Sequence, residues 1–289
     1  MPLLKIIVLA IVQGLAELLP VSSSAHVVVA EKLLGLDPSS PPMTLLLVML
    51  HTGTMVAVIA YFWPQWRRDW FSSAAAFRRF AALLVIATAC TAVIYEGSFM
   101  LLARTVLRGE PHAEIEDLFG RLDFIAPALA AAGVLILVSA VFGGRRSAAP
   151  PSAANDLSAA RAGVIGAVQG LCLPFRGFSR SGATISTAML LGVEKSRAEA
   201  FSFALAVVLT PPVVAREALR LVKAVPPGGG AELGSVVWLT VVGAIVALGA
   251  GLLALKWLSR WLEGGRWYYF GIYCLVASAA VSVLHHLGY

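Results

Sequence analysis

The side chains in this sequence that could do chemistry gather in two short segments, residues 13–26 and residues 169–184. The first holds a carboxylate, three consecutive serines and a histidine, and the second holds an arginine among hydroxyl residues. Both segments begin with Gln-Gly-Leu and run into Leu-Leu-Gly, so they resemble two copies of one motif. Because polar groups are costly inside hydrocarbon, their presence twice in an apolar chain predicts that the two motifs act together.

The acidic residue of the first motif is Glu17, which follows Gln13 by four positions. Residues with this spacing lie on one face of a helix, so we expect the two side chains to be neighbours. A carboxylate on an apolar helix should face a cavity, pair with a cation or hold a divalent metal. The alternative is a structural carboxylate capped by a hydroxyl. We favour a functional role, because an apolar residue would fill a structural place at lower cost.

The three serines of the first motif follow Pro20. One of them could cap a helix that begins just after them, but capping explains a single hydroxyl. Three hydroxyls near a carboxylate and a histidine indicate either hydrogen bonds to phosphate or a nucleophile beside a base. His26 lies about one helical turn after Ser22 and Ser23, and it could be that base or a donor to a phosphate oxygen.

The second motif ends in the residues Ser179-Arg180-Ser181-Gly182-Ala183-Thr184. A guanidinium fork, hydroxyls and the N–H groups of a helix start are the parts from which anion sites are built. Arg180 could instead snorkel to lipid headgroups. The clustering of hydroxyls around it favours a phosphate ligand. Arg176 adds a second cation, which could bind either substrate or lipid.

The composition of the chain indicates a membrane protein. Of its 289 residues, 59% are hydrophobic and only 13% are charged, which lies outside the range of soluble domains. About six stretches approach the length and apolarity of a bilayer crossing. They are residues 43–63, 81–102, 122–142, 201–215 with its continuation, 234–255 and 267–287. We therefore expect an all-α, polytopic membrane protein.

Both motifs also interrupt apolar segments, residues 3–34 and 162–191, with Pro, Gly or hydroxyl residues near the centre. Non-helical backbone at membrane depth is tolerated only where protein or a watery cavity satisfies it. We therefore expect two re-entrant helix–loop–helix segments. The basic loops at 66–79 and 143–161 should be cytoplasmic. Counting crossings from these loops gives the re-entrant segments opposite orientations, as in an inverted-topology repeat.

This repeat divides a single integral membrane domain, residues 1–289, into a first half at 1–142, a hinge loop at 143–161 and a second half at 162–289. The net charge of +6 reflects basic residues in short loops beside membrane spans, which indicates contact with anionic lipid and not with nucleic acid. His51 precedes small residues that allow close helix packing, and we interpret it as a packing residue.

Together the motifs resemble those of the bacterial undecaprenyl-pyrophosphate phosphatases, also called bacitracin-resistance proteins. The resemblance covers nearly the whole chain. It rests on Gln13 and Glu17 followed by Pro-Val-Ser-Ser-Ser-Ala-His at 20–26, and on Ser-Arg-Ser-Gly-Ala-Thr at 179–184. Two features differ from the family pattern: Gln13 stands where many members carry Glu, and Pro174 is displaced upstream in the turn before the arginine.

The resemblance implies the reaction, the site and the location. The enzyme would remove the terminal phosphate of a C55 polyprenyl pyrophosphate and so return the lipid carrier to peptidoglycan and envelope synthesis. By resemblance the catalytic residues are Glu17, Ser22, Ser23, His26 and Arg180, and the substrate-binding residues are Gln13, Ser179, Arg180, Ser181 and Thr184. Glu17 would also hold a divalent cation, Mg²⁺ or Ca²⁺. The protein would lie in the bacterial inner (cytoplasmic) membrane, with membrane lipids around it and a homodimer as one option.

A transporter or lipid flippase is the alternative function, since inverted repeats with broken helices are typical of that class. A serine-rich acidic motif together with Ser-Arg-Ser is more than translocation of a lipid requires, so we favour hydrolysis. The sequence leaves open whether Ser22 or Ser23 attacks the phosphate directly or orients a water.

Overall fold

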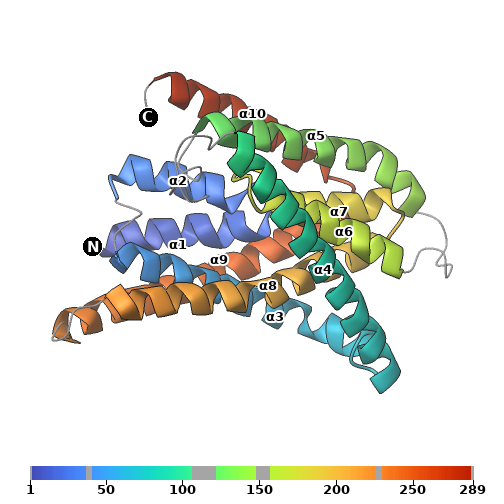
Figure 1. Cartoon of the computed structure of the whole chain (residues 1–289), viewed down its shortest axis with the longest axis horizontal. Coiled ribbons are helices and arrows are strands. Elements are labelled where there is room, and N and C mark those ends of the chain that lie inside the picture. Colours follow the sequence, from blue (N-terminus) through green and yellow to red (C-terminus); the bar gives the residue numbers. More distant parts are fainter. Residues whose placement is uncertain (1, 37–40, 106–121, 148–156, 225–229, 288–289) are drawn as a thin grey trace. The chain divides into compact units, whose positions relative to one another are not determined.

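The computed structural model describes residues 2–36, 41–105, 122–147, 157–224 and 230–287, and these residues are mainly helical. Figure 1 shows the helices that follow one another along them. They are α1 (Leu3–Leu18), α2 (Ser23–Leu34), α3 (Pro41–Asp69), α4 (Ala74–Thr105), α5 (Leu122–Ser147), α6 (Ala159–Cys172), α7 (Arg180–Leu190), α8 (Lys195–Ala224), α9 (Gly230–Glu263) and α10 (Tyr268–His286).

Within the described residues, six helices are long and apolar enough to cross a membrane. Their spans are Met43–Asp69, Ala74–Thr105, Leu122–Gly143, Lys195–Arg216, Val237–Glu263 and Tyr268–His286. They correspond in order to the six expected stretches, which confirms a multi-pass, all-helical membrane protein. The fourth span begins at Lys195 and not at residue 201, because α8 already includes the charged residues Arg197 and Glu199. Glu199 is buried there and accepts a hydrogen bond from Ser259 (2.7 Å).

The two motifs lie on short helices. α1 and α2 have 16 and 12 residues and are separated by residues 19–22, and α6 and α7 have 14 and 11 residues and are separated by residues 173–179. Each is shorter than the roughly 20 residues of a membrane crossing. α1 packs against α2, and α6 packs against α7. The helix breaks therefore occur at the two motifs, as the sequence predicts.

The chain divides into two compact units. Unit 1 comprises residues 1–19, 23–63 and 206–258, and unit 2 comprises residues 20–22, 64–205 and 259–289. The two repeat halves expected from the sequence stay a prediction. Residues 148–156 of the expected hinge lie outside the described residues.

In unit 1, small residues bring α1 and α3 against α9. A Cβ built on Gly14 would lie 2.7 Å from the carbonyl oxygen of Ala247, and a Cβ built on Gly53 would lie 2.2 Å from the carbonyl oxygen of Ala244. Both distances are too short for a real Cβ, so these contacts need glycine. An apolar core surrounds them, formed by Ile6, Leu9, Ala10, Met43, Leu46, Leu50 and Ala247. This packing fixes the helices that carry the polar residues of the first motif.

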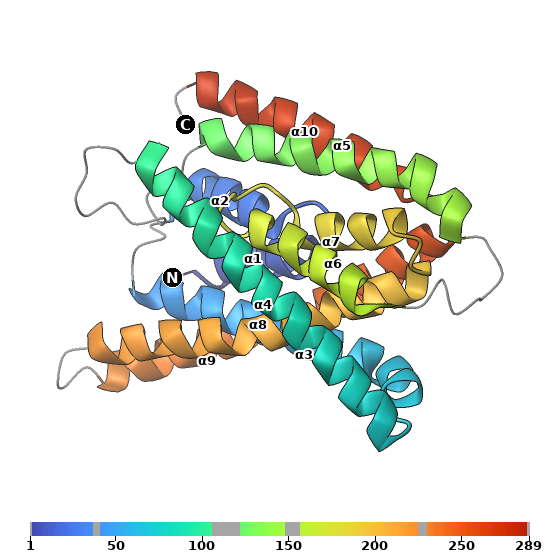
Figure 2. The same cartoon turned by 45° about the vertical axis from the view of Figure 1, so that its right-hand side comes forward.

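In unit 2, α4 packs along α6 and α5 packs along α10, as Figure 2 shows. The first of these contacts also depends on glycine, because a Cβ on Gly166 would lie 2.1 Å from the carbonyl oxygen of Ala87. The second brings Gly133 of α5 against Gly271 of α10, where a Cβ on either would lie 2.9 Å from the other's carbonyl oxygen. Close backbone contact of this kind is typical of helix pairs in membranes.

Candidate active site

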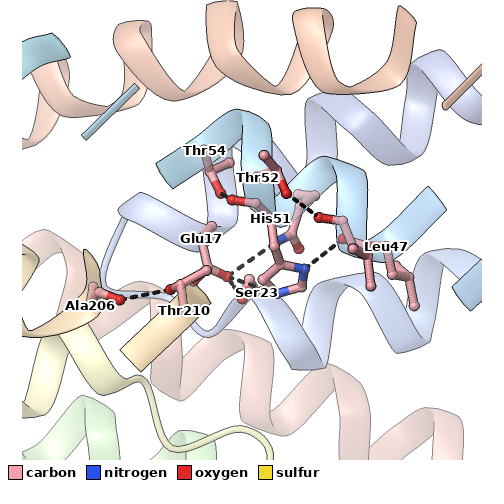
Figure 3. Close-up of polar contacts among 10 residues, drawn as sticks. Glu17, Ser23, Leu47, His51, Thr52, Thr54, Ala206 and Thr210 are labelled. Carbon is pink, nitrogen blue, oxygen red and sulfur yellow. Dashed lines mark hydrogen bonds and ion pairs between the residues drawn. The ribbon is translucent and has the colours of Figure 1, made fainter. Parts of the chain in front are cut away.

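The carboxylate of Glu17 accepts two hydrogen bonds through one oxygen. Its Oε2 accepts from the hydroxyl of Ser23 at 2.5 Å, which Figure 3 shows, and from the amide Nε2 of Gln13 at 3.1 Å. The contact with Gln13 confirms the neighbours expected from the spacing of four. An O–H···O⁻ bond as short as that from Ser23 belongs to the strong, charge-assisted class. Ser23 and Glu17 therefore form a hydroxyl–carboxylate pair between α2 and α1.

His51 of α3 is the third group beside this oxygen. Its Nε2 lies 3.7 Å from Oε2 of Glu17, and its Nδ1 lies 2.8 Å from the carbonyl oxygen of Leu47 (Figure 3). The side chain of His51 is 42% exposed, whereas that of Glu17 is 14% exposed. The sequence favoured a packing role for His51, and the structure instead places it beside the carboxylate. The spacing of residues within one helix does not predict which side chains of two different helices meet, so the sequence could not indicate this contact.

The threonines drawn in Figure 3 use their hydroxyl protons within their own helices. Thr52 donates to the carbonyl of Val48 at 2.8 Å, Thr54 to that of His51 at 2.9 Å, and Thr210 to that of Ala206 at 2.7 Å. Ser23 differs from them, because its proton points to a carboxylate and not to a backbone carbonyl. Among these four hydroxyls, that of Ser23 is therefore the one whose partner could accept its proton in a reaction.

The turn before Ser23 has an unusual backbone. Ser22 is buried and has a φ of 68°, and it is the only residue other than glycine with positive φ in the described part of the chain. Left-handed backbone costs roughly 1–2 kcal/mol for a residue with a Cβ. Strained residues cluster at functional sites, where the surrounding structure holds them in place. A buried left-handed turn therefore directly precedes Ser23.

The second motif lies at the start of α7 in unit 2. Ser179 caps this helix, since its Oγ accepts from the N–H of Gly182 at 3.2 Å. Thr184 donates to the carbonyl of Arg180 at 2.8 Å, and its Oγ1 lies 2.6 Å from the hydroxyl of Ser202 on α8. Arg180 is the first residue of α7 and is partly buried. A guanidinium therefore stands at the positive end of a helix dipole, where anions bind favourably.

Other buried hydrogen bonds hold α7 in its place. The indole N–H of Trp267 lies 3.0 Å from the hydroxyl of Ser139 on α5 and 3.2 Å from that of Ser186 on α7. The hydroxyl of Ser181 is buried and lies 3.5 Å from that of Ser179. The hydroxyls of Ser179, Ser181 and Thr184 therefore all have partners within unit 2.

Part of the first motif lies beside the second within unit 2. A Cβ built on Gly182 would lie 3.2 Å from Cβ of Pro20. The thiol of Cys274 on α10 donates to the carbonyl of Pro20 at 3.3 Å. The segment that leads into Ser22 is therefore held by α10 and lies next to the first turn of α7.

The described residues contain no group of three or more His, Cys, Asp or Glu side chains that could hold a metal ion. Oε2 of Glu17 accepts hydrogen bonds from Gln13 and Ser23. These side chains by themselves do not fit a metal cage. His26 lies on α2, partly buried, and its role as a base stays a prediction.

The fold and the site define a multi-pass membrane protein with a serine–carboxylate pair and a basic helix start. The family model of the bacitracin resistance protein BacA matches residues 6–280. Undecaprenyl-diphosphatase 2 of Acinetobacter baylyi is 52% identical over 287 residues, covering 98% of this chain and 98% of that protein. The undecaprenyl-diphosphatase of Gluconacetobacter diazotrophicus is 36% identical, covering 96% and 95%, and that of Desulfatibacillum aliphaticivorans is 31% identical, covering 97% and 98%. The chain belongs to the BacA family, which confirms the resemblance seen in the motifs.

Proposed function

We propose that this protein hydrolyses undecaprenyl pyrophosphate to undecaprenyl phosphate and inorganic phosphate. The relatives that match it along nearly their whole length are named undecaprenyl-diphosphatases. From the structure, the observation that carries the proposal is the hydrogen bond of 2.5 Å from Ser23 to Glu17. A hydroxyl paired with a carboxylate is an activated nucleophile. Translocation of a lipid has no need of one.

Ser23 supplies the nucleophile in the proposed mechanism. Its Oγ attacks the terminal phosphorus while its proton passes to Oε2 of Glu17. The bond from this phosphorus to the bridging oxygen breaks, undecaprenyl phosphate leaves, and Ser23 carries the phosphoryl group. Gln13 keeps the carboxylate oriented through its amide. A water then attacks the phosphoserine and releases inorganic phosphate.

Arg180 and the N–H groups at the start of α7 are proposed to bind phosphate oxygens. Phosphoryl transfer depends chiefly on positioning and on neutralising charge at these oxygens. A guanidinium can bind two oxygens at once, which an ammonium cannot do in the same geometry. The contact between Gly182 and Pro20 supports a shared role for the second motif and the turn of the first. His26 would act as a base or donate to a phosphate oxygen.

A requirement for Mg²⁺ or Ca²⁺ stays a prediction. A cation would take most of its ligands from substrate phosphates and water, as Mg²⁺ commonly does, with Glu17 as the protein ligand. When bound, it would neutralise phosphate charge. Activity after chelation with EDTA and after readdition of each metal tests the requirement.

The arrangement in the membrane is also a proposal. The shortness of α1, α2, α6 and α7 supports two re-entrant pairs, and the repeated motif supports an inverted repeat. We propose the bacterial inner membrane as the location. Cysteine accessibility from each side of spheroplast membranes tests the orientation, and the mass of the purified protein in detergent tests the homodimer.

The first experiment measures phosphate release from C55 pyrophosphate by the purified protein in detergent, with Mg²⁺ or Ca²⁺. Glu17→Ala and Arg180→Ala are compared with the parent, and thermal unfolding verifies that all three are folded. We expect release by the parent and near-complete loss in both variants. A folded parent that is inactive with either metal would contradict hydrolysis and favour the transporter, which a flux assay of labelled polyprenyl phosphate in proteoliposomes would then examine.

A further inference from the structure

We infer that His51 is a further catalytic residue, whose Nε2 binds the hydrolytic water together with Oε2 of Glu17. This inference rests on the proposed function, because it concerns the second step, in which water cleaves the phosphoserine at Ser23. The observations that carry it are the direction of the His51 ring, the distance to Glu17, and the position of Ser23 on the same oxygen.

The direction of the ring follows from its contact with the backbone. Nδ1 of His51 lies 2.8 Å from the carbonyl oxygen of Leu47. A carbonyl oxygen can only accept a hydrogen bond, so Nδ1 carries the proton. In the neutral ring Nε2 is then an acceptor, and this nitrogen faces Glu17. The contact with Leu47 thus presents a lone pair, and not an N–H, to the carboxylate.

Two acceptors that face one another need a donor between them. The 3.7 Å from Nε2 of His51 to Oε2 of Glu17 is longer than a direct hydrogen bond, for which about 2.7–3.2 Å is usual. Polar atoms separated by more than about 3.5 Å are commonly bridged by water. A water has two hydrogens, so it can donate one to Nε2 and one to Oε2. After the first step Oε2 carries the proton of Ser23, but it keeps a lone pair that can still accept from this water. Both contacts can have ordinary length at this separation.

The position of this water suits attack on the phosphoserine. Oε2 of Glu17 is only 2.5 Å from Oγ of Ser23, so a water on the same oxygen lies beside the atom that carries the phosphoryl group. The side chain of His51 is 42% exposed and that of Glu17 only 14%. The position is therefore open on the His51 side, whereas the carboxylate is largely covered by protein.

The second step transfers the phosphoryl group from Ser23 to water. The oxygen of the water forms a bond to phosphorus, and the bond from phosphorus to Oγ of Ser23 breaks. One proton of the water passes to Nε2 of His51. Glu17 returns to Oγ the proton that it accepted in the first step. Inorganic phosphate leaves as HPO₄²⁻, and His51 releases its proton to solvent, which accounts for the one proton that the net hydrolysis produces.

A direct ion pair between protonated His51 and Glu17 is the competing explanation of the same contact. It would orient the carboxylate and so act on the first step, the attack by Ser23. The two explanations differ in which product is delayed when His51 is removed.

The test is a rapid-mixing experiment with the full-length protein in detergent and C55 pyrophosphate as the substrate. His51→Ala should release about one undecaprenyl phosphate per enzyme at the parent's rate, followed by phosphate release slowed roughly 10²-fold, within the range typical of general-base loss. Phosphorylated Ser23 should accumulate and be detected by mass spectrometry. His51→Gln, whose amide oxygen can accept a hydrogen bond, should recover part of the lost rate.

Two variants serve as controls. Thr52→Val changes the neighbouring residue, whose hydroxyl is used on the carbonyl of Val48, and His285→Ala removes an exposed histidine near the end of α10. Both should behave as the parent does. If His51→Ala slows both products equally with no phosphoserine, or leaves both unchanged, the inference is wrong. An inactive parent would contradict the proposed function instead, so the two failures are distinguishable.

Discussion

In α1 the glutamine that precedes glycine, Gln13, donates its amide to Glu17 four residues later, whereas in α6 the corresponding Gln169 donates to Thr91 of α4. Position 173, four residues after Gln169, is a leucine. The same amide therefore orients a carboxylate in one helix and joins two helices in the other. The two motifs therefore differ in chemistry, although both have a helix–break–helix form.

The hydroxyls of the two motifs differ in the same way. Ser23 donates to a carboxylate, whereas Ser179 caps a helix and Thr184 contacts a backbone carbonyl and another hydroxyl. The first motif thus holds a hydroxyl paired with a carboxylate, which are the proposed nucleophile and proton acceptor. The second provides a rigid helix start with Arg180 at its end. We infer that the acid chemistry belongs to the first copy and the anion binding to the second.

The largest effect is expected for Glu17→Gln. The amide keeps the shape of the side chain but cannot accept the proton of Ser23, so we expect phosphate release to fall by about 10³-fold, within the range for loss of a general base. Phosphate release under single-turnover conditions measures this. Thermal unfolding should change little. A variant that keeps a tenth of the parent rate would show that the first motif is not the acid–base centre.

A smaller effect is expected for Arg180→Lys. Lysine keeps the charge at the start of α7 but loses the two-pronged contact with phosphate. We expect kcat/KM to fall about 10–100-fold in Arg180→Lys. In Arg180→Ala, which also loses the charge, kcat/KM should fall further. Steady-state kinetics on C55 pyrophosphate measure both. Equal rates for parent, Lys and Ala variants would place anion binding outside the second motif.

The matched pair Gln13→Leu and Gln169→Leu separates the two uses of the same amide. Gln13→Leu should lower kcat about tenfold, because Glu17 loses a donor that orients it. Gln169→Leu should leave kcat unchanged, and its loss of stability should be about 1 kcal/mol or less. The reason is that the Gln169 carbonyl oxygen is buried with no hydrogen-bond partner in the described residues, so leucine also removes a polar atom that is costly to bury.

Initial rates and thermal unfolding of both leucine variants measure the contrast. If Gln169→Leu lowers kcat as much as Gln13→Leu does, then both glutamines contribute to the reaction, and a purely structural role of Gln169 is contradicted.

The smallest effect is expected at Ser22, whose φ of 68° suits glycine. Ser22→Gly should keep activity within about threefold, because glycine adopts this backbone without the penalty of a Cβ. Ser22→Val, which is β-branched, should destabilise the turn. Activity and thermal unfolding of both variants provide the test. Loss of activity in Ser22→Gly would instead show that the hydroxyl of Ser22 takes part in the reaction.

Much of the fold could be predicted because a bilayer imposes length and composition on each crossing. The six spans and the two broken segments follow from apolar runs and from the places where Pro and polar residues interrupt them. The start of α8 could not be predicted this way, since Glu199 is charged in the sequence but is buried with Ser259 as partner.

The first motif was predictable within single helices and less so between them. The contact of Gln13 with Glu17 follows from helical periodicity, which is a local property of the chain. The left-handed turn at Ser22, directly before Ser23, was not predictable, because this backbone has no signal in the residue type. The sequence by itself determined which residue types are present for phosphate chemistry and which segments are long and apolar enough to cross the membrane.

Only the tertiary structure decided that His51 stands beside Glu17. The two residues come from different helices, α3 and α1, whose separation is set by the packing of Gly53 and Gly14 against α9. The rotation of one helix against another depends on such contacts along their whole length. No pattern within either helix encodes it, and this is the physical reason that the residue proposed to bind the hydrolytic water emerged from the fold and not from the motif.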